Sequence, residues 1–280
     1  MKTTKTDSFL RWAGSKRQIR SLLASYWQNQ YSSYIEPFVG SGNLFFYLQP
    51  QKSILGDINK ELIDTYIQIK SCAEHVYNLL ISFPTGEKAY YYIRSIKPDT
   101  LSPQEAAARF IYLNIFSFNG LYRTNLDGNF NVPYGRRKET NFPKFDRYLK
   151  CSQSLQNTEL INGDFEIVLN LAKSGDFIYL DPPYRIKAKK TFNEYDKASF
   201  CANDVLRLRN HLEILSSRGV TFLLSYAKSE EAEILMEGYK RLEIVVRRNI
   251  AGFVKDRRNA EEWLITNSDS LDRMKENEHN

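Results

Sequence analysis

The residues best suited to chemistry are Asp181-Pro182-Pro183-Tyr184, which follow the apolar run 177–180. Aromatic and β-branched residues that end at two prolines predict a buried strand that stops in a rigid turn. Because proline has a fixed φ and no backbone N–H, the carbonyls of this turn point outward as acceptors. Together with the Asp181 carboxylate and the ring face of Tyr184, they suit an exocyclic amino group on a planar ring. The structural alternative is an ordinary turn at the end of a strand.

Three other predicted strands also end in residues that could bind a ligand. They are 34–36, followed by the glycine loop 38–43, then 53–56, followed by Asp57, and 160–161, followed by Asp164 and Phe165. A helical pattern comes after each of the three. Alternating strands and helices predict βαβ crossovers and a largely parallel sheet, in which ligands bind at the carboxyl ends of the strands.

The glycine loop and the residues at the next two strand ends suit a nucleoside ligand. The glycines let a ligand approach the backbone and leave the first N–H groups of the next helix free. The third glycine of the dinucleotide fingerprint is absent and the bulky Phe38 precedes Gly40, which disfavours NAD. Asp57 stands where a carboxylate can accept both ribose hydroxyls, with a helix N-cap as the alternative. Asp164 and Phe165 could bracket an adenine, with a helix cap and core packing as the alternatives.

The segment 61–158 is too long for a single crossover between strands. It contains helical patterns at 71–82, 87–96 and 102–117, then an irregular stretch, 118–145, whose Asp127-Gly128 turn signal predicts a protruding hairpin. We interpret it as a domain inserted into another domain, 1–60 and 159–268, and we expect the polar tail 269–280 to be disordered. After the Pro-Pro turn, the pattern predicts a helix, a strand, a short helix and two closing strands, at 203–216, 220–226, 229–236, 241–248 and 261–266.

Composition indicates a globular protein. With 280 residues, 42 % of them hydrophobic and 26 % charged, the chain can bury a large core. No apolar stretch has the length of a membrane helix, and the polar start of the chain is not typical of a secretory signal, so we expect a cytoplasmic protein. The 3 cysteines and 3 histidines are scattered, which predicts neither a metal site nor a disulfide framework. A net charge of +6 permits a polyanionic partner without proving one.

Seven motifs, taken in order, resemble those of the Dam-type DNA adenine-N6 methyltransferases. They are RWAGSK (11–16), EPFVGSGNLF (36–45), GDIN (56–59), FNGLYRTN (118–125), GNFNVPYG (128–135), NGDF (162–165) and DPPY (181–184). Ser15 and Arg11 depart from the glycine and lysine of many members, and the second change could alter a DNA contact. The resemblance implies a Rossmann-like methyltransferase sheet, mostly parallel with an antiparallel closing strand, and an inserted, mainly helical target-recognition domain bearing a β-hairpin.

The resemblance also implies S-adenosylmethionine as the methyl donor. The implied cofactor-binding residues are Trp12, Lys16, Phe38, Gly40, Asp57, Asp164, Phe165 and Asp181. Trp12 and Lys16 are assigned by the resemblance alone. The implied catalytic residues are Asp181, Pro182 and Tyr184. Asp181 and the Pro182 carbonyl would accept the two hydrogens of an adenine amine, which has been flipped out of the duplex and stacked on Tyr184.

Double-stranded DNA is the expected partner, and the expected DNA contacts lie mainly in the insertion. Arg123 suits a guanine edge, Leu121 and Pro133 suit a thymine methyl, and Phe118 and Asn119 could fill the gap left by base flipping. The cations suited to phosphates are Arg136, Arg137, Lys138, Lys255, Arg257 and Arg258. A solvated surface role is the alternative for each cation taken singly.

The hairpin matches members that modify GATC, while relatives that read GATATC share much of it. We therefore expect methylation at a site that contains GAT, with GATC preferred. We also expect the enzyme to be a monomer and to act on nucleoid DNA. Two further alternatives are a methyltransferase acting on amino groups of RNA or protein and a DNA-binding module without catalysis. The hairpin and the order of the motifs argue against the first, and the intact Asp57 and Asp181 argue against the second. The sequence leaves open whether a restriction endonuclease encoded nearby accompanies the enzyme.

Overall fold

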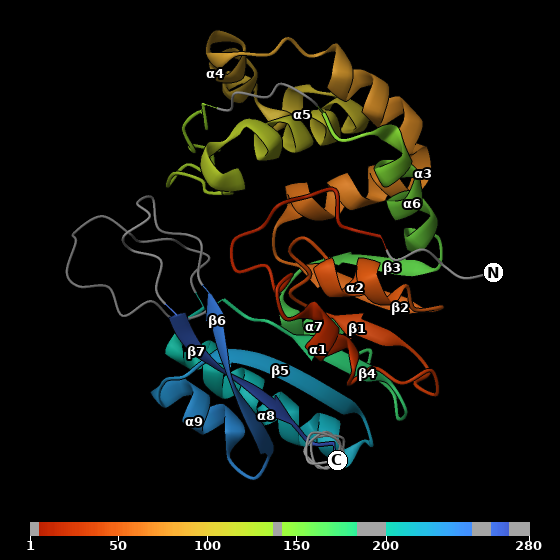
Figure 1. Ribbon diagram of the computed structural model, residues 1–280, viewed down its shortest axis with the longest axis vertical. Helices are drawn as coiled ribbons and strands as arrows, with labels where there is room; N and C mark the ends of the chain where they lie inside the picture. Colours follow the sequence, from red (N-terminus) through yellow and green to blue (C-terminus); the bar gives the residue numbers. More distant parts are fainter. Residues whose placement is uncertain (1–5, 137–141, 184–199, 248–258, 269–280) are drawn as a thin grey trace. The chain divides into compact units, whose positions relative to one another are not determined.

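The computed structural model describes residues 6–136, 142–183, 200–247 and 259–268 (Figure 1). By its internal contacts the chain divides into two compact units. The first unit comprises Met1–Arg17, Gly40–Gln51 and Asp57–Gly163, and the second comprises Gln18–Val39, Lys52–Gly56 and Asp164–Asn280. The domain boundaries expected from the sequence, 1–60 with 159–268 and 61–158, stay a prediction, and the tail 269–280 lies outside the described residues.

The described strands form one sheet with the order β3-β2-β1-β4-β5-β7-β6. Their bounds are β1 Tyr34–Glu36, β2 Ser53–Asp57, β3 Thr158–Asn162, β4 Phe177–Leu180, β5 Thr221–Ala227, β6 Lys240–Arg247 and β7 Asn259–Thr266. β1 pairs in parallel with β2 and β4, and β4 pairs in parallel with β5. β7 runs antiparallel to both β5 and β6. The predicted mostly parallel, Rossmann-like sheet with an antiparallel closing strand is therefore confirmed.

The central strands β1 and β4 are buried on both faces, as is typical of parallel strands covered on both sides. Every residue of β1 and β4 is buried. Ile35 pairs with Ile54 on one side and with Ile178 on the other. After Leu180, Pro182 and Pro183 cannot donate ladder hydrogen bonds, so β4 ends where the Pro-Pro turn begins.

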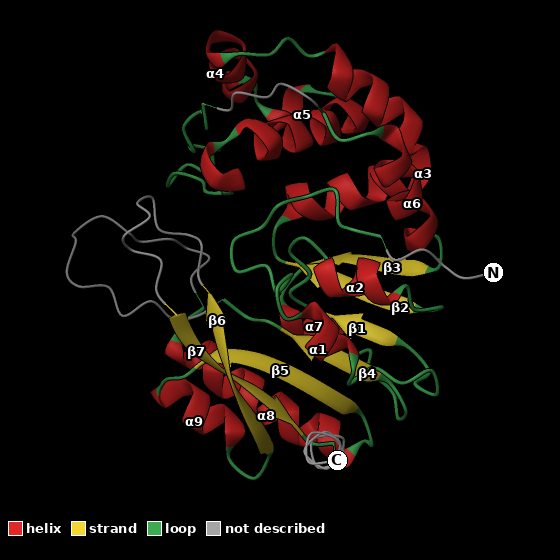
Figure 2. Ribbon diagram, viewed as in Figure 1, coloured by secondary structure: helices red, strands yellow, loops and turns green. Residues whose placement is uncertain are grey.

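The helices described in the second unit are α1 Arg20–Ala24, α7 Phe165–Leu169, α8 Ala202–Ser217 and α9 Glu230–Met236. Of these, α7, α8 and α9 pack on strands of the sheet. α8 buries Val205, Leu208, Leu212 and Leu215, a stripe at helical spacing, and it packs on β5. α9 packs on β7 and α7 on β1 (Figure 2). In the chain, β3 ends at Asn162, Asp164 is the N-cap of α7, and Phe165 is its first residue.

The first unit is mainly helical. Its α-helices are α2 Asn43–Leu48, α3 Lys60–Ser82, α4 Glu87–Ser95, α5 Pro103–Phe116 and α6 Phe145–Leu155, and its 3₁₀ turns are η1 Pro98–Thr100 and η2 Phe118–Gly120. α5 begins with a capping box between Ser102 and Glu105, and every residue from Ala107 to Phe116 is buried. α3 packs on α5 and is interrupted at Cys72, whose φ of −148° and ψ of 48° are not helical. Within the described ranges, no helix combines the length and the apolar character needed to cross a membrane.

The predicted hairpin is present as two isolated antiparallel bridges rather than as two strands. The bridges join Ser117 to Tyr134 and Thr124 to Phe130. The Asn125 side chain closes the turn by accepting hydrogen bonds from the N–H groups of Asp127 (3.2 Å) and Asn129 (2.8 Å). At the base of the hairpin, the Val132 carbonyl accepts from the Tyr90 hydroxyl (2.9 Å) and from Arg94 Nη1 (3.1 Å). These bonds fix the hairpin to α4.

Candidate active site

Asp181 directly follows β4 and is held by a buried hydroxyl pair. Ser225 Oγ, on the neighbouring β5, donates to Asp181 Oδ1 at 3.1 Å. Tyr179 Oη lies 3.0 Å from the same Ser225 Oγ. Because Ser225 has one hydroxyl hydrogen and gives it to Asp181, Tyr179 is the donor in the second bond. Burial, with the nearby Asp181 charge adding to it, raises the pKa of Tyr179 well above its usual value, so the phenol keeps its proton.

This hydroxyl pair orients one oxygen of Asp181. Ser225 is fully buried, and Tyr179 is 2 % exposed. The sequence analysis missed both residues, since a hydroxyl inside an apolar strand carries no signal of a partner on another strand. Pro182, the second predicted catalytic residue, is buried next to Asp181. The third, Tyr184, lies outside the described residues.

Asp57 in the first unit is held by backbone groups. Its Oδ2 accepts from the Gly40 N–H (3.0 Å), and its Oδ1 accepts from the Asn59 N–H (2.9 Å). The N-cap of α3 is Asn59, whose side chain accepts from the Leu62 N–H, so the N-cap alternative for Asp57 is wrong. Burial raises the pKa of Asp57, although these backbone hydrogen bonds oppose the shift. The carboxylate therefore lies against the glycine loop.

Trp12 lies on that glycine loop. Gly40 has a φ of +46°, and a Cβ at this position would meet Trp12 Cδ1 at 2.7 Å. The Gly40 carbonyl accepts from the Tyr66 hydroxyl at 2.7 Å. The Trp12 indole also stacks on the ring of Tyr122, with centroids 5.6 Å apart. Lys16, the other residue assigned by resemblance, is buried, and its ammonium donates to the Gly14 carbonyl at 3.2 Å.

Asp164 and Phe165 begin α7 in the second unit. Asp164 caps the helix, because its Oδ1 accepts from the Glu166 N–H at 3.0 Å. Phe165 is buried, with its ring centroid 5.4 Å from that of Phe38 and 5.9 Å from that of Phe200. The cap and core-packing alternatives are therefore both realised. Neither uses Asp164 Oδ2, which makes no hydrogen bond or ion pair with any residue that the structure describes.

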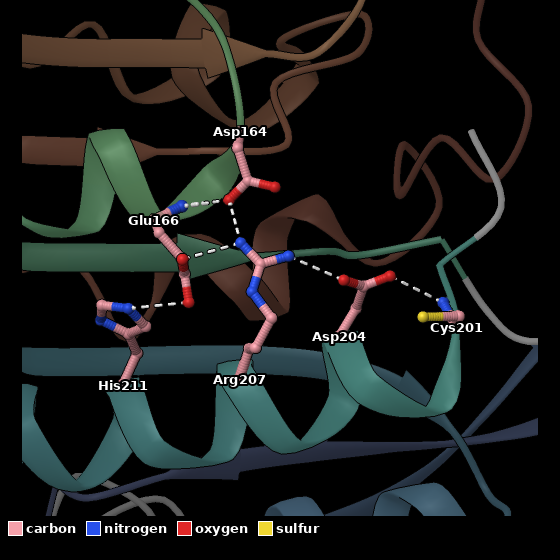
Figure 3. Close-up of polar contacts among 6 residues, drawn as sticks. All are labelled: Asp164, Glu166, Cys201, Asp204, Arg207 and His211. Carbon is pink, nitrogen blue, oxygen red and sulfur yellow. Dashed lines mark hydrogen bonds and ion pairs between the residues drawn. The ribbon is translucent and has the colours of Figure 1, made fainter. Parts of the chain in front are cut away.

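A single arginine on α8 joins three carboxylates (Figure 3). The Arg207 guanidinium contacts Asp164 Oδ1 at 2.7 Å, Glu166 Oε2 at 2.7 Å and Asp204 Oδ1 at 2.8 Å. It also lies 4.8 Å from the centroid of the Phe165 ring. The hydrogen bond with Arg207 lowers the pKa of Glu166 and raises the pKa of Arg207, so both groups stay charged. Nothing in the local sequence marked Arg207, because its partners lie on α7 as well as on its own helix.

The first unit carries the described residues that were predicted to contact DNA. They are Arg11, Phe118, Asn119, Leu121, Arg123, Pro133 and Arg136, all exposed except the half-buried Leu121. Arg123 Nε donates to Asn131 Oδ1 at 2.7 Å, which fixes the direction of the guanidinium. Lys255 and Arg257, together with Arg137, Lys138 and Arg258, lie outside the described residues.

Asn114 joins the N-terminal motif to the turn that begins the hairpin. Its Oδ1 accepts from the Arg11 N–H (2.9 Å), and its Nδ2 donates to the carbonyls of Arg11 (2.8 Å) and Gly120 (3.4 Å). Gly120 has a φ of +67°, and a Cβ there would meet Arg11 Cβ at 2.8 Å. Arg11 is thus held beside the turn at 118–121. The sequence analysis predicted both segments as DNA contacts but missed the asparagine that connects them.

The fold and these strand ends define a class. A mostly parallel sheet with an antiparallel closing strand, a glycine loop after β1 and an acidic residue after β4 is the arrangement of the Rossmann-like methyltransferases. The comparison with known families is more specific. The model of the D12 class N6 adenine-specific DNA methyltransferases matches residues 12–250, and the chain belongs to this family.

Relatives match the chain over nearly its whole length. The type II methyltransferase M1.LlaDCHI of Lactococcus lactis subsp. cremoris is 35 % identical over 268 residues, which cover 92 % of this chain and 94 % of the relative. The type II methyltransferase M.MjaIII of Methanocaldococcus jannaschii is 33 % identical over 265 residues, covering 86 % and 92 %. The DNA adenine methylase of Escherichia coli K12 is 30 % identical over 268 residues, covering 93 % and 95 %. The predicted family and its adenine-specific methyltransferase activity are confirmed.

Proposed function

We propose that this enzyme transfers a methyl group from S-adenosylmethionine to adenine N6 in duplex DNA, at a short palindrome that contains GAT and is preferentially GATC. The observation that carries the catalytic part is Asp181, placed at the end of β4 and oriented there by the hydroxyl of Ser225. Family membership supports the substrate base and the reacting nitrogen.

The catalytic residues have to overcome the low nucleophilicity of the adenine amine. The lone pair of adenine N6 is delocalised into the ring and is a poor nucleophile. Asp181 and the Pro182 carbonyl accept hydrogen bonds from the two N6 hydrogens, which favours a pyramidal nitrogen with a localised lone pair. S-adenosylmethionine, when bound, supplies an electrophilic methyl group on a cationic sulfur. The chain contributes positioning and fixed acceptors, without a covalent bond to the enzyme.

The residues proposed to hold the cofactor fit its parts. In the first unit, Asp57 accepts the ribose hydroxyls beside the Gly40 backbone, where no side chain has room. Trp12 and Lys16 contact the methionine part. In the second unit, Asp164 has one carboxylate oxygen without a partner among the described residues, and the Phe165 ring lies beside it. Phe38 packs on that ring.

The hairpin residues are proposed to read the target. Arg123 is exposed and fixed by Asn131, so its guanidinium can form a bidentate pair with a guanine edge. Leu121 and Pro133 contact thymine methyl groups. The adenine leaves the stack at a cost of a few kcal/mol, and stacking on Tyr184 returns about 1–3 kcal/mol. The proposed phosphate contacts are Arg11, Arg136, Lys255 and Arg257. Phe118 and Asn119 are proposed to fill the gap that the flipped adenine leaves in the duplex.

We place the enzyme on nucleoid DNA as a monomer. Two relatives are named type II methyltransferases, so a cognate restriction endonuclease in the same cell, without direct contact, belongs to the proposal. The second candidate for the target is GATATC, because the hairpin pattern is shared.

Sequencing of N6-methyladenine in DNA tests the target. The chain is expressed in cells that lack adenine methylation, and the modified positions are mapped. We expect methylation of GATC sites and none with Asp181→Ala. Methylation only at GATATC would keep the chemistry and overturn the target, while methylation confined to sites without GAT would contradict the assignment.

A further inference from the structure

Asp164 is held so that one of its carboxylate oxygens remains available. Its Oδ1 takes two hydrogen bonds, from Arg207 Nη2 at 2.7 Å and from the Glu166 N–H at 3.0 Å. Its Oδ2 takes none from the described residues, as Figure 3 shows. Two donors on one oxygen fix the side-chain rotamer, and the second oxygen then points in a defined direction.

Arg207 is itself fixed independently of Asp164. Its guanidinium also binds Glu166 Oε2 (2.7 Å) and Asp204 Oδ1 (2.8 Å). Those two partners are tied in turn, because Glu166 Oε1 lies 3.3 Å from His211 Nε2 and Asp204 Oδ2 accepts from the Cys201 N–H at 2.8 Å. Arg207 would keep most of its contacts without Asp164, so the arginine places the aspartate rather than the reverse.

The same guanidinium lies 4.8 Å from the centre of the Phe165 ring. A cation at this distance is attracted to the ring face. Arg207 therefore contacts both residues to which the adenine of the cofactor is assigned, one through a charged hydrogen bond and one through its ring.

We propose that Arg207 is a positioning residue for cofactor recognition: it presents Asp164 Oδ2 as an acceptor for the 6-amino group of the cofactor's adenine, beside the Phe165 ring. This inference rests on the proposed role of Asp164 and Phe165. It has a consequence for selectivity, because a purine with a 6-oxo group would place an acceptor against an acceptor. Arg207 should then determine how strongly the enzyme prefers an adenine ring over a hypoxanthine ring.

A clamp that only joins α7 to α8 would behave differently. Its loss would lower the melting temperature and weaken all ligands alike, without changing their ratio. The amino-against-oxo selectivity therefore separates a positioning role from a structural one.

The test measures binding to the full-length protein by calorimetry. The ligands are S-adenosylhomocysteine and S-inosylhomocysteine, which differ at purine position 6. The variants are Arg207→Met, Arg207→Lys, which keeps the charge but loses the forked donors, and Asp164→Ala. Arg209→Met is the matched control, because Arg209 is on the same helix but contacts Glu213, Glu237 and Tyr239.

We expect Arg207→Met to raise the Kd of S-adenosylhomocysteine about tenfold, the effect of one charged hydrogen bond. The Kd of the inosyl compound should change much less, so the selectivity falls. Arg207→Lys should lie between the wild type and Arg207→Met, and Arg209→Met should leave the ratio of the two Kd values unchanged.

Two results would overturn the inference, and they differ. If Asp164→Ala loses the selectivity while both Arg207 variants keep it, Arg207 is not the positioning residue and the proposed cofactor role of Asp164 stands. If Asp164→Ala keeps full affinity and selectivity, the proposed role of Asp164 fails and the inference fails with it. Should Arg207→Met not fold, Arg207→Lys alone gives the same decision.

Discussion

Asp57 and Asp164 are both carboxylates at strand ends, but the chain holds them in different ways. Asp57 in the first unit is bound by the backbone N–H groups of Gly40 and Asn59. Asp164 in the second unit is bound by the side chain of Arg207 as well as by the Glu166 N–H, and it is part of a half-exposed ionic cluster. Backbone donors move only if the loop moves, whereas a side-chain donor can be removed by one substitution or weakened by salt. The hydrogen bonds that hold Asp57 and those that hold Asp164 should therefore respond to different perturbations.

The largest effect on cofactor binding is expected from a substitution that disturbs the backbone hydrogen bonds to Asp57. Gly40→Ala adds a Cβ at 2.7 Å from Trp12 Cδ1 in a residue with a φ of +46°. The left-handed conformation costs about 1–2 kcal/mol and the overlap about 1–3 kcal/mol. We expect binding of S-adenosylhomocysteine to be lost or greatly weakened in calorimetry.

A matched glycine separates the two costs of that change. Gly238 also has a positive φ, +77°, but a Cβ there would meet nothing within 4 Å. Gly238→Ala should lower the melting temperature and leave the cofactor Kd unaltered. Equal cofactor affinity in Gly40→Ala and wild type would mean that the glycine loop does not receive the ligand.

Ser225→Ala tests a side-chain grip on a third carboxylate, Asp181. Loss of one hydrogen bond to a charged group is expected to cost about 1.5–3 kcal/mol, so kcat should fall about tenfold to a hundredfold. The KM for DNA should change little, because Ser225 is fully buried. Thr266→Val is the control, since Thr266 is a buried hydroxyl in the same sheet that bonds the Phe222 carbonyl. An unchanged kcat in Ser225→Ala would remove the orienting role.

Lowering the pH should test the contribution of Asp57 to cofactor binding. Burial raises the pKa of Asp57 above its usual value, so this carboxylate gains its proton at a higher pH than an exposed one. Ribose hydroxyls donate best to the ionised form, so cofactor affinity should fall by up to about tenfold per pH unit below that pKa. A plot of cofactor affinity against pH should show this fall for the wild type and should not show it for Asp57→Asn. A profile that is identical in the variant would show that another group titrates.

Added salt should have the smallest effect on cofactor binding, and it should act only on the ion pair between Arg207 and Asp164. The Debye length shortens to about 3 Å at 1 M salt, and the Arg207 and Asp164 side chains are 30 % and 38 % exposed. We expect a modest rise, below about threefold, in the Kd of S-adenosylhomocysteine for the wild type. Arg207→Met should show less of it. Affinity that depends equally on salt in both proteins would mean that the ionic cluster does not bear on the cofactor.

The sequence predicted the sheet well, because its strands are apolar runs that end at residues with clear local rules. Helix 203–216 is α8, Ala202–Ser217, since its apolar residues repeat at helical spacing. α6 was not predicted, although Tyr148, Cys151 and Leu155 are buried at spacings of three and four residues. The polar residues between them, Lys150, Ser152, Gln153 and Ser154, concealed the pattern. The predicted hairpin forms isolated bridges rather than two strands, and side-chain bonds of Asn125 close its turn in addition to the backbone bonds across it.

The site was predicted where contacts are close in the chain or follow from strand order. Asp57 beside Gly40 is of this kind, because both follow neighbouring parallel strands. Ser225, Arg207 and Asn114 were not predicted, since Ser225 and Asn114 meet their partners through tertiary packing and Arg207 meets Asp164 and Glu166 in the same way. Trp12 required the family resemblance, and its contact with Gly40 shows why: the tryptophan and the loop are distant in sequence and meet through one ring face.

The most direct test of the account is methyl transfer by Asp181→Ala. Radiolabelled methyl groups from S-adenosylmethionine are counted in a duplex that contains one GATC site, with binding to the same duplex measured in parallel. We expect that the wild type labels adenine N6 and that the variant, still folded and still bound to DNA, is slower by at least about 10²–10³. Turnover close to the wild-type rate in Asp181→Ala would contradict it.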